Sequence, residues 1–180
     1  AETLDGQDST DFAGTSDLAA KANAADVYTK TEIDAKLSGS ISISGAAFRA
    51  RSASTTATIG SGGELFMATG TDDRFYAPVV LPHGATITGM YTTLWDNEAT
   101  DYLRLELQRV AYVSGYSTLA TINSTTSVGA DTAYSTTSIV NGTIDTENYT
   151  YVLSVYDPVG IWASIGTDLR FQGARIDYTM

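Results

Sequence analysis

The segment from Trp95 to Asp101 places a large aromatic ring directly beside several oxygen-bearing side chains. An aromatic ring covers the apolar C–H face of a sugar, while carboxylates and amides bond its hydroxyl groups. Further along the chain, tyrosines add rings of the same kind. We therefore predict a carbohydrate-binding site made of Trp95, Asp96, Asn97, Asp101, Tyr112 and Tyr116. The alternative is that these rings only pack within a sheet, where tyrosine and tryptophan are favoured.

The same acidic loop, residues 96–101, is also a candidate calcium ligand set, because calcium takes six to eight oxygen ligands. Its spacing does not match an EF-hand, and a hairpin loop whose Asp and Asn side chains bond their own backbone explains it as well. Residues 72–73 and 145–148 have the same character. The chain has no cysteine and one histidine, which excludes thiolate and histidine-cluster sites. We expect neither a metal site nor a cofactor.

Catalytic signals are weak. The single histidine, His83, stands between Pro82 and Gly84, and no Gly-x-Ser-x-Gly motif supplies a nucleophile for it. Glu64, Glu106 and the loop aspartates could be imagined as supplying a glycosidase pair, but that chemistry needs two carboxyl groups at a set separation across a cleft. Glu106 is interpreted as lying on the solvent face of a strand. The chain is therefore predicted not to be an enzyme.

Composition bounds the class of protein. The chain has 180 residues, with 43% hydrophobic and 17% charged residues, which is typical of a globular protein. No run of about 18 apolar residues occurs, so we expect no membrane insertion. The formal charge is −11, so the chain lacks the basic surplus that phosphate contacts require. Nucleic acid is therefore not expected as a partner.

From residue 41 onward the pattern is typical of short strands separated by turn clusters. In residues 103–108, Leu103, Leu105 and Leu107 alternate with polar side chains, which indicates a strand with one buried and one wet face. The pattern predicts a mainly β fold, an antiparallel β-sandwich or jelly-roll head over residues 41–180. The strands are expected near residues 41–51, 54–59, 64–69, 74–81, 85–95, 102–113, 116–123, 133–140, 149–157, 161–165 and 168–178.

Residues 1–40 differ in character, since all three lysines precede residue 40 and all seven arginines follow it. Short helices are predicted over 16–23 and 29–38, the second with a Thr29 to Glu32 capping box. Helices this short are marginal alone, so their apolar side chains must be covered by the downstream domain or by copies of the chain. We predict a connecting and trimerising segment whose oligomerisation residues are Leu18, Val27, Tyr28, Ile33 and Leu37.

Two stretches of this segment resemble elements of phage tail-fibre-like and bacterial fibrous surface proteins. Residues 3–13, TLDGQDSTDFA, resemble their LDGxDSxxFA element, and residues 27–34, VYTKTEID, resemble the YYTKxEID element that often follows it. The histidine-rich stretch usually found between the two is replaced by NAAD at residues 23–26. Residues 76–88 are similar to a strand–turn–strand entry of exported bacterial β domains, to which no activity attaches. The resemblance implies a homotrimeric fibre or appendage tip, located extracellularly, at the cell surface or on a virion.

Together these patterns predict a non-enzymatic, homotrimeric, tail-fibre-like protein whose β head binds a surface receptor, with carbohydrate as the favoured ligand. Its expected partners are copies of itself, a surface glycan or other receptor, and neighbouring fibre or virion subunits. One alternative is a purely structural virion or extracellular filament subunit, whose β faces contact other subunits. A second alternative is a secreted glycan hydrolase.

Overall fold

The computed structural model describes residues 32–33, 37–70, 74–124, 129–160, 162 and 166–180. The chain divides into two compact units, Ala1–Leu37 and Ser38–Met180. In the first unit, Leu37 donates a backbone hydrogen bond of 3.0 Å to Ile33, and both side chains are exposed. Three of the predicted oligomerisation residues, Leu18, Val27 and Tyr28, lie outside the described residues.

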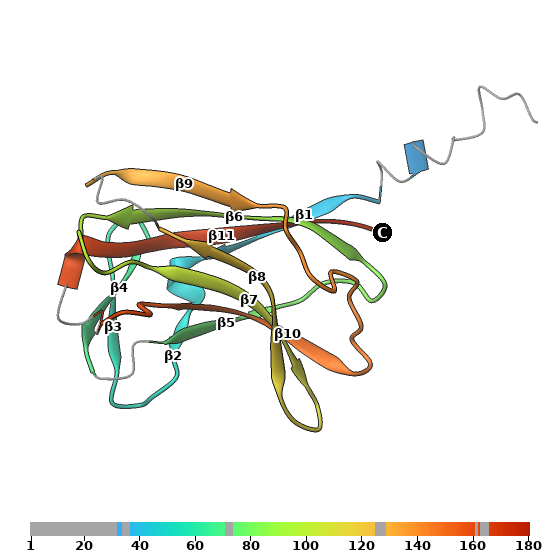
Figure 1. The fold of residues 1–180 in the computed structure, drawn as a ribbon, viewed down its shortest axis with the longest axis horizontal. Helices are drawn as coiled ribbons and strands as arrows, with labels where there is room; N and C mark the ends of the chain where they lie inside the picture. Colours follow the sequence, from blue (N-terminus) through green and yellow to red (C-terminus); the bar gives the residue numbers. More distant parts are fainter. Residues whose placement is uncertain (1–31, 34–36, 71–73, 125–128, 161, 163–165) are drawn as a thin grey trace, which may run out of the picture. The chain divides into compact units, whose positions relative to one another are not determined.

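The second unit is a sandwich of two antiparallel sheets, which confirms the predicted fold class (Figure 1). One sheet has six strands: β3 (Thr56–Ile59), β4 (Leu65–Thr69), β11 (Leu169–Thr179), β6 (Thr86–Asp96) and β9 (Asp131–Thr136) in this order, with β1 (Gly39–Ser44) also paired to β11. The other sheet has five: β2 (Arg49–Ala50), β5 (Phe75–Val79), β10 (Tyr149–Tyr156), β7 (Arg104–Ala111) and β8 (Tyr116–Asn123). Short 3-10 turns occur at η1 (Gly45–Ala47) and η2 (Gly166–Asp168).

The core lies between the two sheets and is built by strict alternation along the strands. Leu105 and Leu107 of β7 are fully buried, as are Leu153 and Val155 of the neighbouring β10. Trp162 is also fully buried, and its indole N–H donates a 2.8 Å hydrogen bond to the Leu169 carbonyl. Each such side chain stabilises the fold by roughly 2–5 kcal/mol against truncation to alanine.

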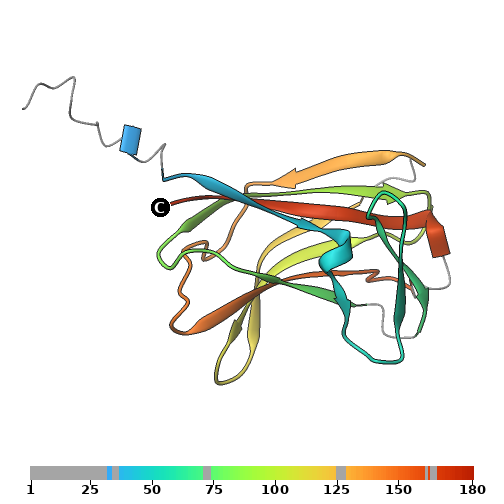
Figure 2. The same cartoon turned by 180° about the vertical axis from the view of Figure 1, so that it is seen from behind.

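The single strand predicted over residues 41–51 is wrong, because this segment passes from one sheet to the other. Ser44 ends β1, and its hydroxyl accepts a hydrogen bond from the backbone N–H of Ala46 in η1. Gly45 makes the corner possible, since a Cβ there would lie 2.6 Å from the Phe171 carbonyl oxygen. Figure 2 shows the chain leaving β1, turning through η1 and entering the other layer. The strand expected over 161–165 lies mostly outside the described residues, and Trp162 within it is helical.

Among the described residues, no helix has the length and apolar character needed to span a membrane.

Candidate functional site

The outer face of the five-stranded sheet carries polar side chains that are buried. Ser154 of β10 lies opposite Tyr76 of β5 and Glu106 of β7, and its two neighbours in β10 face the core. Glu106 is 8% exposed, Gln108 3% and Ser154 0%. The interpretation of Glu106 as lying on a wet strand face is therefore wrong. We call this surface the five-stranded face and define it by Arg74, Tyr76, Arg104, Glu106, Gln108, Tyr116, Val152, Ser154 and Tyr156.

Glu106 is the centre of a hydrogen-bonded cluster on this face. Its Oε1 accepts a 2.9 Å hydrogen bond from the Tyr156 hydroxyl, and its Oε2 accepts one of 2.7 Å from Gln108 Nε2. Arg74 Nη1 lies 3.9 Å from the same Oε2. Burial, together with the hydrogen bond to the Glu106 carboxylate, raises the pKa of Tyr156, so its phenol keeps the proton that it donates. Buried charge is costly without such partners, so this cluster holds Glu106 in one orientation.

Two guanidinium groups are fixed beside Glu106. Arg74 Cζ lies 3.6 Å from the centroid of the Tyr156 ring, a cation–π arrangement. Arg104 donates hydrogen bonds of 3.0 Å from Nε to Asn123 Oδ1 and from Nη2 to the Tyr102 hydroxyl. Because both side chains are held in place, little rotamer entropy remains to be lost when a ligand accepts from them.

A hollow of about 480 Å³ lies beside this cluster, of which Arg74 and Gln108 line it. Its lining includes Arg51, Arg74, Tyr76, Gln108, Tyr116 and Val152. A smaller hollow of about 220 Å³ continues at Tyr116 and Tyr149. Ser154 Oγ, one row from the hollow, is buried and has no hydrogen-bond partner in the part of the chain that the structure describes. The arrangement offers aromatic rings and oriented donors in one concave surface, which is the composition of a small-ligand site.

The six predicted ligand-binding residues do not lie on one face. Trp95 projects from the outer face of the six-stranded sheet, where Arg170 Cζ lies 5.0 Å from its ring centroid. Tyr116 lines the hollow of the five-stranded face. Tyr112 follows the end of β7, is 61% exposed, and its hydroxyl donates to the Thr146 carbonyl. Of the six, Tyr116 alone lines the hollow beside the buried polar cluster.

The acidic members of the predicted site maintain loop structure. The Asp96 carboxylate is 3% exposed and accepts the backbone N–H of Glu98 at 3.1 Å. Asn97 Nδ2 donates to Asp168 Oδ1 at 3.2 Å, and Asp101 Oδ2 accepts from the Thr100 hydroxyl at 2.9 Å. These contacts match the alternative in which loop side chains bond their own surroundings.

The other polar loops also bond within themselves. The Asp145 carboxylate accepts the Asn148 side chain and the backbone N–H groups of Glu147 and Asn148, and these bonds lower its pKa. The nearby His83 Nδ1 accepts the backbone N–H of Thr146 at 3.2 Å. Residues 72–73 lie outside the described part. Among the described residues, no group of three or more His, Asp or Glu side chains is placed to hold a metal ion.

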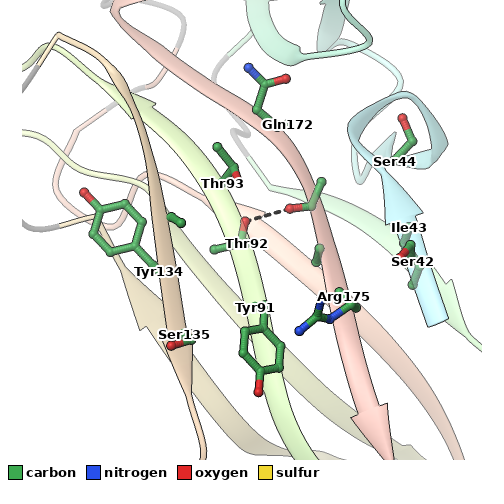
Figure 3. Close-up of a pocket in the computed structure, with 13 residues that line it drawn as sticks. Ser42, Ile43, Ser44, Tyr91, Thr92, Thr93, Tyr134, Ser135, Gln172 and Arg175 are labelled. Carbon is green, nitrogen blue, oxygen red and sulfur yellow. Dashed lines mark hydrogen bonds between the residues drawn. The ribbon is translucent and has the colours of Figure 1, made fainter. Parts of the chain in front are cut away.

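A second hollow, of about 670 Å³, lies on the outer face of the six-stranded sheet (Figure 3). Tyr91 and Arg175 line it side by side, with the guanidinium carbon 4.2 Å from the ring centroid. Arg175 is paired with Asp177 at 3.0 Å. The backbone kinks beside this pair at Gly173, whose carbonyl accepts the Thr92 hydroxyl at 2.7 Å. The polar side chains that line this hollow from the outer face, such as those of Tyr91 and Arg175, are half-buried or exposed rather than buried in a cluster.

Sequence reasoning missed Arg74, Tyr76, Arg104, Gln108, Ser154 and Tyr156. A signal was present in β7 and β10, where polar residues alternate with apolar ones and so share one face. That pattern indicates which residues point away from the core. It does not indicate what covers them, because Tyr156 reaches Glu106 from β10 and Arg74 reaches it from just before β5.

The fold is similar to two solved structures of carbohydrate-binding modules. The C-terminal CBM6 of LamC, a marine laminarinase from Zobellia galactanivorans, matches with a TM-score of 0.50 and 14% identity, covering 77% of this chain and 98% of that one. The CBM22-1–GH10 modules of Clostridium thermocellum xylanase 10B, solved with xylohexaose, match with a TM-score of 0.50 and 13% identity, covering 78% of this chain and 28% of that one. At these identities the likeness shows a shared β-sandwich fold. No protein-family model and no curated protein matches the chain.

Proposed function

We propose that the β domain is a carbohydrate-binding module and that its site is the five-stranded face. The observation that carries the proposal is the buried cluster of Glu106, Gln108 and Tyr156 on an outer sheet face, where Gln108 also lines a hollow of about 480 Å³. Burying these polar groups costs free energy, and they lie outside the hydrophobic core, so packing of the core does not explain them. The fold shared with modules of the CBM6 and CBM22 classes supports the same function.

Tyr76 and Tyr116 are the rings placed to cover the C–H face of a sugar, since both line the hollow. Arg74 and Gln108 lie in the same lining and supply N–H donors for hydroxyl and ring oxygens. Because the cluster is already ordered, binding costs little rearrangement.

The test is a glycan array with the full chain, followed by calorimetry with the sugars retained. Tyr76→Ala and Tyr116→Ala are expected to weaken binding by about tenfold or more, as stacking rings are worth roughly 1–3 kcal/mol. Tyr91→Ala is the matched control, because Tyr91 lies in the hollow of the opposite sheet. Loss of binding in Tyr91→Ala, with Tyr76→Ala and Tyr116→Ala unaffected, would move the site to the six-stranded sheet.

We further propose that the chain binds glycan without hydrolysing it. Glu106 is the only acidic residue in the five strands of this sheet, and both of its oxygens already accept hydrogen bonds. A glycosidase needs a second carboxyl group across the cleft. Chromatography of the retained glycans after long incubation should show no shortened products. Products that disappear in Glu106→Gln would instead favour the hydrolase.

Residues 1–40 are proposed to join three copies into a tail-fibre-like assembly at a cell surface or on a virion. Ile33 and Leu37 are large apolar side chains that are 44% and 46% exposed. Trimerisation would present three weak sites together and raise avidity by roughly 10²–10⁴. Light scattering of the full chain should give a trimer that Leu37→Asp dissociates, whereas Val80→Asp, at an exposed position of the β domain, leaves it intact. A monomeric wild-type chain contradicts this part of the proposal.

A further inference from the structure

Strand β7 brings a carboxylate and an amide together on the five-stranded face. Glu106 and Gln108 are two residues apart in this strand, so both point away from the core. Both are buried, and Gln108 Nε2 donates a 2.7 Å hydrogen bond to Glu106 Oε2. Gln108 also lines the hollow of about 480 Å³. The amide therefore has Glu106 on one side and the hollow on another.

The orientation of the Gln108 amide follows from the chemistry of its neighbour. An amide carries N–H donors on its nitrogen and an acceptor on its oxygen, whereas a carboxylate only accepts. The end of the amide that meets Glu106 must therefore be the nitrogen. The carboxylate is itself held, because its Oε1 accepts from the Tyr156 hydroxyl at 2.9 Å and Arg74 Nη1 lies 3.9 Å from its Oε2. A fixed carboxylate thus fixes the amide.

The carbonyl oxygen of this amide is left for a ligand. Within the part of the chain that the structure describes, Gln108 Oε1 accepts no hydrogen bond and is not fully buried. Gln108 is paired across the sheet with Val152, whose side chain has no donor, and with Thr118, which is exposed. Because Gln108 and Val152 both line the hollow, the oxygen reaches solvent there. The hollow therefore offers an oriented acceptor as well as N–H donors.

We propose that Glu106 is a positioning residue of the glycan site, which holds the Gln108 carbonyl oxygen toward the hollow to accept a hydrogen bond from a sugar hydroxyl. This inference rests on the proposed carbohydrate-binding function and adds a specificity-determining contact. A sugar without a hydroxyl at this position removes water from Gln108 Oε1 without replacing the lost bond, so the site rejects it. Since the amide is oriented before binding, the contact costs little rearrangement.

The experiment is calorimetry of the full chain with sugars from which single hydroxyl groups have been deleted. The parent sugars are xylohexaose, laminarihexaose, cellohexaose and mannohexaose or, where the glycan array retains a different glycan, that glycan. Each analogue lacks one hydroxyl group of a central sugar. With the wild-type chain, at least one analogue should bind about tenfold more weakly than its parent. With Gln108→Leu, that analogue and its parent should bind equally, which identifies the hydroxyl that Gln108 contacts.

Glu106→Gln tests the positioning role. A glutamine at this position can either donate to or accept from the Gln108 amide, so the amide is no longer held in one orientation. The penalty for the missing hydroxyl should fall from about tenfold to about threefold or less. Ile176→Val is the control, because Ile176 is fully buried in β11 of the other sheet. This variant loses stability without touching the site, and it should keep the tenfold penalty.

A second measurement needs no ligand. One of the two side-chain amide protons of Gln108 is bonded to Glu106, so it should exchange with water more slowly than the other. Nitrogen–proton NMR of the full chain measures both exchange rates, and Gln108→Leu assigns the pair of signals by their loss. In Glu106→Gln the difference between the two rates should shrink.

The outcomes separate this inference from the function on which it rests. No glycan retained on the array, and none of the four hexasaccharides bound, overturns both. Glycan binding in which Gln108→Leu removes no analogue's penalty overturns the inference and leaves carbohydrate binding in place. A penalty that Glu106→Gln leaves at tenfold, or that Ile176→Val also removes, overturns positioning by Glu106. Equal exchange rates for the two Gln108 amide protons in the wild-type chain do the same.

Discussion

The Tyr156 hydroxyl donates a 2.9 Å hydrogen bond to Glu106 across a distance of 50 residues in sequence. The Arg74 guanidinium lies over the face of the same phenol ring, with its Cζ 3.6 Å from the ring centroid. One tyrosine thus satisfies a buried carboxylate with its edge and supports a cation with its ring. This sheet face is an ordered polar surface, to which Tyr156 contributes contacts with both Glu106 and Arg74.

Tyr156→Phe isolates the hydroxyl from the ring. The variant keeps the surface on which Arg74 lies but leaves Glu106 Oε1 buried without its donor, which should destabilise the fold by about 1–3 kcal/mol. Urea denaturation followed by far-UV circular dichroism measures the difference. Tyr112→Phe is the control, because its hydroxyl bonds the Thr146 carbonyl at an exposed site and its loss should cost less than about 0.5 kcal/mol. Equal costs in the two variants would show that Glu106 does not depend on Tyr156.

Alternation along the strands predicted the β-sandwich because it records a local property, the side of the strand on which a residue points. Leu103, Leu105 and Leu107 were assigned to the core in this way, and all three are fully buried. Alternation could not predict that Glu106 is buried, because the side chains that bury it come from β10 and from Arg74. The outward face of a strand is exposed to solvent only where no side chain from a neighbouring segment lies over it.

The site prediction was limited by the same physics. Trp95 and Tyr116 each carry an aromatic ring beyond the core, but β6 belongs to one sheet and β8 to the other. Sheet membership is decided by long-range pairing, which neighbouring residues in the sequence do not record. Asp96 and Asn97 could not be distinguished from ligand-binding residues either, since the same oxygen and amide groups serve as loop bonds.

Asp157 should destabilise the folded protein at neutral pH, where its carboxyl group is ionised, relative to mild acid, where it is protonated. Burial raises its pKa, and the charges of Asp101 and Asp96 add to that effect against the N–H bonds from Val159 and Gly160. A carboxyl whose folded pKa is raised stabilises the fold below its unfolded pKa, and this stabilisation is lost as pH rises through the folded value.

Asp157→Asn should therefore melt at a higher temperature than wild type at pH about 7, with the difference shrinking toward pH about 4. The asparagine carbonyl can still accept from Val159 and Gly160, and its amide would lie near Asp101, since both carboxylates approach the same point above Gly160. Differential scanning calorimetry across this pH range is the measurement. A neutral-pH melting temperature below that of wild type would contradict the assignment of Asp157 as a destabilising charge.

Asp145→Asn should show the opposite sign. The hydrogen bond from the Asn148 side chain, and those from the backbone N–H groups of Glu147 and Asn148, lower the pKa of Asp145. Its contribution is present above the unfolded pKa and is lost as pH falls through the folded value. The variant should melt below wild type at neutral pH and converge with it in acid. The same calorimetric series measures both aspartates, and curves that move in parallel would refute the distinction between them.

Gly173 joins two features of the six-stranded sheet, the bulge in β11 and the close approach of β1. Its φ of 148° lies in a region that favours glycine, and a Cβ would stand 2.6 Å from the Ile43 carbonyl oxygen. Gly173→Ala must either strain the backbone or push β1 from β11, and should cost at least about 2 kcal/mol. Gly84→Ala is matched to it, since Gly84 has a φ of 82° with nothing within 4 Å of its Cβ position, and should cost about 1 kcal/mol. Urea unfolding gives both values. If the two substitutions cost the same, backbone conformation alone accounts for Gly173, and the contact with Ile43 adds nothing to the stability of the sheet.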